Sequence, residues 1–304
     1  MQVNELFKQS NTILLDGGMG TMLQAAGLKL GARPEELNIT DPALIEGIHG
    51  QYAAAGSRIV NANTFGASAH KLAGSTYTLE QVITAGIENC KRACAPYGAL
   101  TALDVGPLGE LLEPSGTLAF EDAVAEYARI VKAGEAAGAD LIFFETYTDL
   151  YELKAALLAA KENTRLPILA SMSFEAGGRT FTGCTVESFA ATARGLGADA
   201  VGINCSLGPK EIFPMAKPSI ITIILFNFLS FWNEYIISMT LMSSTKAPRT
   251  LPVGLLNLMQ AQQSAAQYGT MYAGLLLGML PTLILYICVQ RQLTQGMTVG
   301  GLKG

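Results

Sequence analysis

The sequence predicts an α/β fold, a truncated (β/α)8 barrel of about six βα units, followed by two transmembrane helices. Short apolar runs alternate with amphipathic stretches up to Lys217, and polar residues stand just after each run, as at the mouth of a parallel barrel. Beyond Lys217 charges become rare and two long apolar runs follow. A doubly wound open sheet is the alternative fold for the first part.

Six apolar runs predict strands, because each is short and rich in Ile, Val, Leu or Phe on both faces. In chain order they cover residues 12–15, 58–62, 99–105, 140–145, 167–172 and 200–204. Amphipathic stretches between them predict the helices that would cover a parallel sheet, at residues 43–55, 79–95, 120–137, 151–161 and 186–196.

Polar or reactive side chains stand at the predicted carboxyl end of each strand. Because the carboxyl ends of parallel strands meet on one face of a barrel, these residues are the candidates for chemistry. In chain order they are Asp16, Asn63, Thr64, Asp104, Glu145, Thr146, Ser173, Asn204 and Cys205.

The glycine-rich turn 16–21 invites a dinucleotide-binding interpretation, which fails on spacing. A G-x-G-x-x-G motif that starts at Gly18 would need glycine at Leu23. The second strand also ends in Asn61 and Asn63, without the acidic residue that holds a ribose. A tight βα turn explains the glycines but leaves Asp16 without a role.

The charge balance is acidic, with a formal net charge of −5, and gives no support to nucleic-acid binding. Residues 1–10 lack the basic and apolar regions of a secretory signal, so we expect the first part in the cytoplasm. The 5 cysteines have no disulfide-framework spacing. In a reducing compartment each is either a buried thiol or a ligand.

Six segments in collinear order resemble the homocysteine S-methyltransferase domain, and most of all the N-terminal barrel of cobalamin-dependent methionine synthase. The resemblance covers residues 1–211, which we predict to be one domain. Its segments are LLDGGMGTMLQ (14–24), EELNIT (35–40), NANTFGAS (61–68), DVGPLGELLEPSG (104–116), ADLIFFETYTDLYELKAAL (139–157) and GINCSLGP (202–209).

The resemblance implies a (β/α)8 barrel that transfers a methyl group to the thiol of homocysteine and gives methionine. It implies a zinc ion that activates this thiol, with Cys205 as one zinc ligand. Thiolate-bound zinc favours a deprotonated substrate thiol, whose ordinary pKa of about 8.5 makes it a poor nucleophile at neutral pH. By the same resemblance Asp16 and Glu145 bind the amino-acid end of homocysteine, and Asn63 and Asn204 support the substrate site.

The sequence departs from this family in its zinc ligands and in its strand number. The family's other two zinc thiolates come from adjacent cysteines, and this sequence has no such pair. Six strands cannot close with the tilt and stagger of eight. We therefore expect impaired methyl transfer.

The sequence does not identify the methyl donor. Methylcobalamin from another domain or protein is one option, beside S-methylmethionine and S-adenosylmethionine.

Two apolar runs near the end of the chain predict membrane spans, at about 218–242 and 268–289. A helix of about 20 residues crosses the hydrocarbon core of a bilayer. Glu234 is the only charged residue within the first run, and Pro281 lies within the second. Such a pair would place this part of the chain in the inner membrane, in contact with lipid.

The same region resembles the C-terminal end of a maltose-type carbohydrate ABC-transporter permease. The matching segments are IFPMAKPSIITIILFNFLSFWNEY (212–235), RTLPVGLLNL (249–258) and QRQLTQGMTVGGLKG (290–304). We predict a second domain over 212–304, and the resemblance implies a second permease subunit and an ATPase subunit as partners. The sequence leaves three interpretations open, namely a methyltransferase, a permease fragment, and an inactive chimera of the two.

Overall fold

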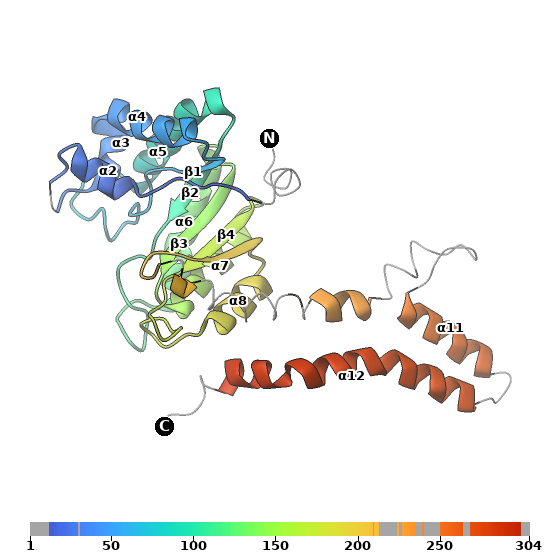
Figure 1. Cartoon of the computed structure of the whole chain (residues 1–304). Coiled ribbons are helices and arrows are strands. Elements are labelled where there is room, and N and C mark those ends of the chain that lie inside the picture. Colours follow the sequence, from blue (N-terminus) through green and yellow to red (C-terminus); the bar gives the residue numbers. More distant parts are fainter. Residues whose placement is uncertain are drawn as a thin grey trace. The chain divides into compact units, whose positions relative to one another are not determined.

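The protein is described by a computed structural model, which places residues 12–29, 31–208, 210–212, 224, 227–234, 239, 250–263 and 268–298 (Figure 1). The chain divides into two compact units, Met1–Ile212 and Phe213–Gly304. Each unit is described by itself.

The first unit is built on a parallel sheet of 5 strands in the order β1-β2-β3-β4-β5. The first predicted strand is shorter than expected, since Leu15 forms one isolated parallel bridge with Ile59. The strand order contains no reversal, which a doubly wound sheet requires, so the sheet is consistent with part of a barrel. The strands are β1 (Ile59–Asn61), β2 (Leu100–Val105), β3 (Leu141–Tyr147), β4 (Ile168–Met172) and β5 (Ala200–Ile203).

Helices connect the strands at the positions that the periodicity predicts. Several begin at side-chain caps, for example α7 at Asp149, whose carboxylate accepts from the backbone N–H of Tyr151, and α8 at Thr185. In chain order the helical elements of the first unit are α2 (Met19–Ala25), η1 (Pro34–Glu36), α3 (Leu37–Thr40), α4 (Pro42–Ala54), α5 (Leu79–Cys94), η2 (Ala95–Tyr97), α6 (Phe120–Ala136), α7 (Leu150–Asn163) and α8 (Val186–Gly195).

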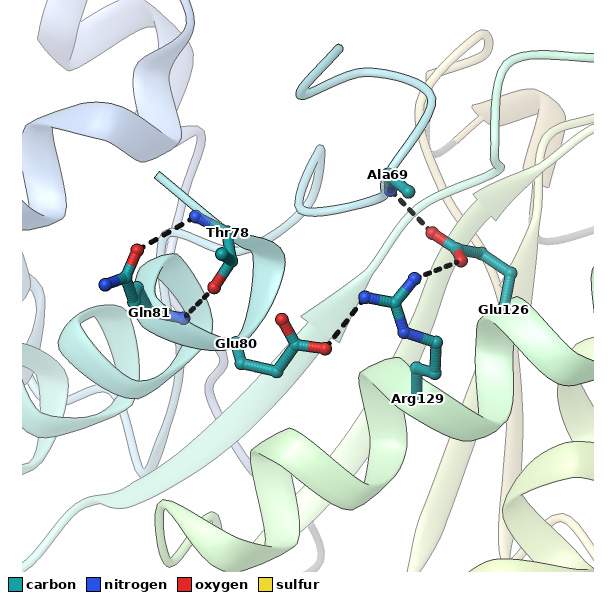
Figure 2. A network of polar contacts seen from close by, with 6 residues as sticks. All are labelled: Ala69, Thr78, Glu80, Gln81, Glu126 and Arg129. Carbon is teal, nitrogen blue, oxygen red and sulfur yellow. Dashed lines mark hydrogen bonds and ion pairs between the residues drawn. The ribbon is translucent and has the colours of Figure 1, made fainter. Parts of the chain in front are cut away.

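Polar contacts join helices α5 and α6 at the surface, as Figure 2 shows. Helix α5 starts with a capping box, in which Thr78 and Gln81 each accept a backbone N–H from the other. In the same turn, Glu80 accepts from Arg129 of α6 at 2.9 Å. This contact links two neighbouring βα units at the surface.

The two faces of the sheet bury different side chains, because residues alternate along a strand. On β2, Leu103 faces helix α6, where a Cβ on Gly134 would collide with it. The opposite face holds an apolar cluster at the amino ends of the strands and polar residues at their carboxyl ends. The buried members of this cluster are Ile59, Leu100, Ala102, Leu141, Phe143 and Leu169.

The described residues of the second unit are helical for the most part. Helix α11 (Leu251–Gln263) approaches α12 (Tyr268–Thr298) at Gly278, where a Cβ would lie 2.7 Å from Leu255 Cδ1. Trp232 Nε1 donates to the Gly278 carbonyl at 3.3 Å. Glycine at this position thus permits the close approach of these segments.

The prediction of two transmembrane helices is not supported. Residues 268–289 do lie in a helix, α12, whereas 218–242 lie mostly outside the described residues. Among the residues that the structure places, no helix combines the length and the apolar character that a membrane crossing needs.

Candidate functional site

The carboxyl ends of the strands gather a group of acidic side chains. Asp16 follows the Leu15 bridge, and its Oδ2 accepts from the backbone N–H of Asn61 at the end of β1, at 3.0 Å. Glu145 of β3 forms a side-chain hydrogen bond with Asp104 of β2. The charges of Asp16 and Glu145 also act on one another. We call Asp16, Asp104 and Glu145 the acid cluster.

Burial gives the acid cluster unusual protonation behaviour. Burial, opposed by the Asn61 hydrogen bond and reinforced by Glu145, raises the pKa of Asp16 to about 7. Burial also raises the pKa of Glu145, against the hydrogen bonds from Asp104 and Asn204. The pKa of Asp104 is raised most strongly, by burial and then by the neighbouring charges of Glu145 and Asp16. A cation placed among these carboxyls would relieve their repulsion.

Asp104 belongs to this site although sequence reasoning gave it no role beyond its strand-end position. Its side chain is 7% exposed, and its Oδ1 has no hydrogen-bond partner among the described residues. A signal was present, since Leu100, Ala102 and Asp104 alternate onto one face of β2 and only the last is polar. An unpaired buried carboxyl oxygen marks a place for a ligand or a proton.

Asn204 connects the acid cluster to Cys205. Its Nδ2 donates to Glu145 Oε1 at 3.1 Å and to Thr146 Oγ1 at 2.7 Å, and lies 3.5 Å from Cys205 Sγ. The Cys205 side chain is exposed. The structure thus brings four of the five predicted site residues, Asp16, Glu145, Asn204 and Cys205, to one end of the sheet.

Asn63, the fifth predicted site residue, lies in a different arrangement. Its Nδ2 donates to the Pro34 carbonyl at 2.8 Å and to Asn38 Oδ1 at 2.9 Å, while Asn38 Nδ2 donates to the Asn63 carbonyl. Both amide hydrogens of Asn63 are therefore used within the protein. These contacts tie the loop after β1 to η1 and α3.

The described residues do not fit the zinc ion that the resemblance implies. A zinc site that binds a substrate needs about three protein ligands. Within the described part of the chain, no group of three or more His, Cys, Asp or Glu side chains converges in a way that could hold a metal ion. Cys205 stands as a single sulfur with hydroxyl and amide neighbours.

Among the described residues, no hydrogen bond joins the other cysteines to Cys205, whose sulfur neighbours are Thr146 and Asn204. Cys90 and Cys94 are buried on helix α5, with their sulfurs 3.8 Å apart. Cys184 is half-buried and donates to the Thr185 carbonyl at 3.2 Å, and burial raises its pKa to about 11. None of these thiols completes a donor set with Cys205 among the described residues.

Comparison with known proteins gives a family match over most of the chain. The sequence pattern of the family described as "Homocysteine S-methyltransferase" matches residues 13–244. The match continues beyond residue 211, where the motif-based resemblance ends, into the part of the chain for which a permease origin is predicted. Nothing in these comparisons shows the permease resemblance.

Two similar curated proteins are methionine synthases. The chain is 30% identical to methionine synthase of Mycobacterium tuberculosis over 217 residues and 31% identical to that of Mycobacterium leprae over 219 residues. Each match covers 65% of this chain but only 18% of the relative. The chain therefore spans less than a fifth of the length of these relatives.

Among solved structures, the chain is similar in fold to the homocysteine methyltransferase MmuM from Escherichia coli. The metallated form aligns with a TM-score of 0.63 at 22% identity, over 73% of this chain and 82% of that one. The apo form aligns with a TM-score of 0.58, over 73% of this chain and 80% of that one. At this identity the likeness concerns the fold alone.

Proposed function

Because this chain belongs to the homocysteine S-methyltransferase family, we propose that its first unit binds homocysteine at the carboxyl ends of the strands. The proposal rests chiefly on the acid cluster. Asp104 is buried, Asp16 and Glu145 are half-buried, and the ion pairs of the described residues include none of the three. Burying carboxyls outside an ion pair costs free energy, so the arrangement favours a positively charged ligand.

The α-ammonium group of homocysteine is such a cation. We place it between Asp16 and Glu145, which present acceptors at the carboxyl ends of the strands and act on each other electrostatically. Binding the ammonium group would favour the ionised carboxylates and release protons from the site. Asn204, bonded to Glu145 at 3.1 Å, would hold that carboxylate in place.

The thiol end of homocysteine would lie on the Cys205 side of the site. Homocysteine is a short molecule, so its thiol must lie near Glu145 when Glu145 binds its amino group. Cys205 is near Glu145, because the Asn204 side chain lies between the two. The family reaction puts a methyl group on this sulfur and gives methionine. Since the described donor set does not fit zinc, we propose only homocysteine binding as the role of the described residues.

Methyl transfer would then need groups beyond those described. We propose that the methyl donor, methylcobalamin or another, is brought by another domain or protein, because the chain matches only 18% of the methionine synthases. No described residue is assigned to the donor.

Calorimetric titration of the full chain tests the proposal. L-homocysteine should bind, and 4-mercaptobutyrate, which lacks the amino group, should bind at least about tenfold more weakly, because a charged hydrogen bond contributes about 1.5–3 kcal/mol. Asp16→Asn with Glu145→Gln should remove this preference. Glu162→Gln, at an exposed position of α7, is the matched control and should keep it. Equal affinity of wild type for both thiols would contradict the proposal.

A second function is supported by the surface of helix α12. We propose that this helix binds a lipid surface, because large apolar side chains are exposed over three turns of it. Leu277 is 67% exposed and Ile284 is 55% exposed. Exposed apolar area of this kind marks an interaction site.

Flotation of the full chain with phosphatidylcholine vesicles tests this proposal, and the double variant Leu277→Glu with Ile284→Glu should abolish flotation. Flotation of that variant at the wild-type level would contradict it.

A further inference from the structure

Strand β3 contains an irregularity at the site. The β3–β4 ladder pairs Phe144 with Ala170 and Tyr147 with Met172, and its register shifts in between. Two residues of β3, Glu145 and Thr146, therefore oppose one residue of β4. Such a bulge re-aims a side chain and is frequent beside active sites.

Thr146 shows how much the backbone departs from a regular strand. Its φ is 60°, in the left-handed region, which is unusual for a β-branched residue. In a regular strand the Thr146 side chain would leave on the face opposite to Glu145. Instead its Oγ1 lies 2.7 Å from Asn204 Nδ2 and 3.4 Å from Cys205 Sγ. The bulge thus turns the Thr146 hydroxyl toward the sulfur.

The backbone around the hydroxyl is fixed on both sides. The Thr146 N–H donates to Ser171 Oγ of β4 at 3.2 Å. On the other side, Cys205 also has a left-handed backbone, with a φ of 62°. Two non-glycine residues in this conformation, in contact through their side chains, are held by the surrounding structure.

A count of hydrogens assigns the role of the hydroxyl. The Nδ2 of Asn204 carries two hydrogens and lies near three acceptors, on Glu145, Thr146 and Cys205. The contacts to Glu145 and Thr146 are the shorter ones and use both hydrogens. The Thr146 oxygen then accepts from Asn204, which leaves its own hydrogen available for donation to the Cys205 sulfur, 3.4 Å away.

We propose that the Glu145–Thr146 bulge makes Thr146 a positioning residue, whose hydroxyl donates to the Cys205 sulfur and holds it beside the acid cluster. This deepens the proposed function, on which it rests for the view that the site receives homocysteine. The contact links the part of the site that would hold the amino group to the part that would face the substrate sulfur.

Alkylation of Cys205 in the full chain tests the proposal without any substrate. Iodoacetamide is used at fixed pH, and peptide mass spectrometry follows the carbamidomethylation rate at Cys205 alone. Thr146→Val keeps the β-branched shape and the backbone strain but removes the hydroxyl. Without the hydroxyl the sulfur should spend less time in the exposed position that the structure shows. Alkylation should therefore slow by up to about fivefold, the factor that corresponds to one net hydrogen bond of about 1 kcal/mol.

Three further variants make the result specific. Thr146→Ser keeps the hydroxyl and should react within about twofold of wild type. Thr146→Gly removes the hydroxyl and relieves the strain, so it serves if Thr146→Val does not fold, and it should be as slow. Thr148→Val, at an exposed position two residues away, is the control and should match wild type.

Two outcomes would overturn the proposal. One is a wild-type alkylation rate in every folded variant that lacks the hydroxyl. The other is a Thr146→Ser protein that is as slow as Thr146→Val, since shape and not the hydroxyl would then matter. Because alkylation needs no amino acid, failure of the chain to bind homocysteine would contradict only the proposed function.

Discussion

The two units of this chain place their unsatisfied groups differently. In the first unit large apolar side chains such as Phe144 are fully buried, and a carboxyl oxygen of Asp104 is buried with no hydrogen-bond partner among the described residues. In the second unit large apolar side chains such as Leu277 are exposed. Among the residues that the structure describes, the first unit therefore buries a polar atom that a polar ligand could pair with, whereas the second exposes apolar side chains that an apolar surface could cover. Each feature indicates the chemistry of what would bind there.

Truncating one apolar side chain in each unit should give the largest difference in the free energy of unfolding. Phe144→Ala removes a fully buried ring of β3 and should lower the free energy of unfolding by about 3–5 kcal/mol. Ile284→Ala removes a side chain of α12 that is 55% exposed and should change it by less than about 0.5 kcal/mol. Urea unfolding followed by circular dichroism measures both. A large loss for Ile284→Ala would show that the second unit has an apolar covering in solution.

Removing one charge of the acid cluster should stabilise the first unit above neutral pH. The pKa of Asp16 is about 7 in the folded protein against 3.8, so its neutral form favours folding, and this contribution is lost as the pH rises from 3.8 to about 7. Asp16→Asn should therefore be more stable than wild type at pH 8, by on the order of 2 kcal/mol after allowance for partial exposure.

At low pH the stability advantage of Asp16→Asn should disappear. At pH 4 the Asp16 carboxyl of wild type is already protonated in the folded protein, so the advantage of Asp16→Asn should nearly vanish. Urea unfolding at pH 4, 6 and 8 measures this difference. A constant difference across that range would mean that Asp16 titrates normally in the folded chain.

The surface contacts of Figure 2 should contribute little to the free energy of unfolding. Arg129 is 51% exposed and its partner Glu80 is 49% exposed, so solvent screens their ion pair. Arg129→Ala should lower the free energy of unfolding by less than about 1 kcal/mol. Thermal unfolding at low and at high salt measures the effect, and the variant should be less sensitive to salt than wild type. A loss comparable to that of Phe144→Ala would refute this ranking.

Much of the site could be predicted from the sequence because strand order determines which residues meet. Strands that follow one another in a parallel sheet have their carboxyl ends at the same edge. Residues at those ends therefore lie together, as Asp16, Glu145, Asn204 and Cys205 do. The α/β class and the parallel sheet follow from the same alternation of apolar runs and helices.

Other features depend on pairing that a single sequence does not display. The role of Thr146 arises from a bulge, and a bulge is a property of two strands in register. Asn63 is engaged by Asn38, 25 residues away in the sequence. The first predicted strand is reduced to one bridge at Leu15. The apolar composition of 268–289 predicted a membrane span, but composition alone does not decide between crossing a bilayer and covering another surface.

A crystal structure of the full chain with L-homocysteine tests the central claim most directly. The account predicts the amino nitrogen within hydrogen-bond distance of the Asp16 and Glu145 carboxylates, with the substrate sulfur on the Cys205 side of Asn204. An amino acid bound with its ammonium group away from both carboxylates, or homocysteine absent from this edge at saturating concentration, would contradict it.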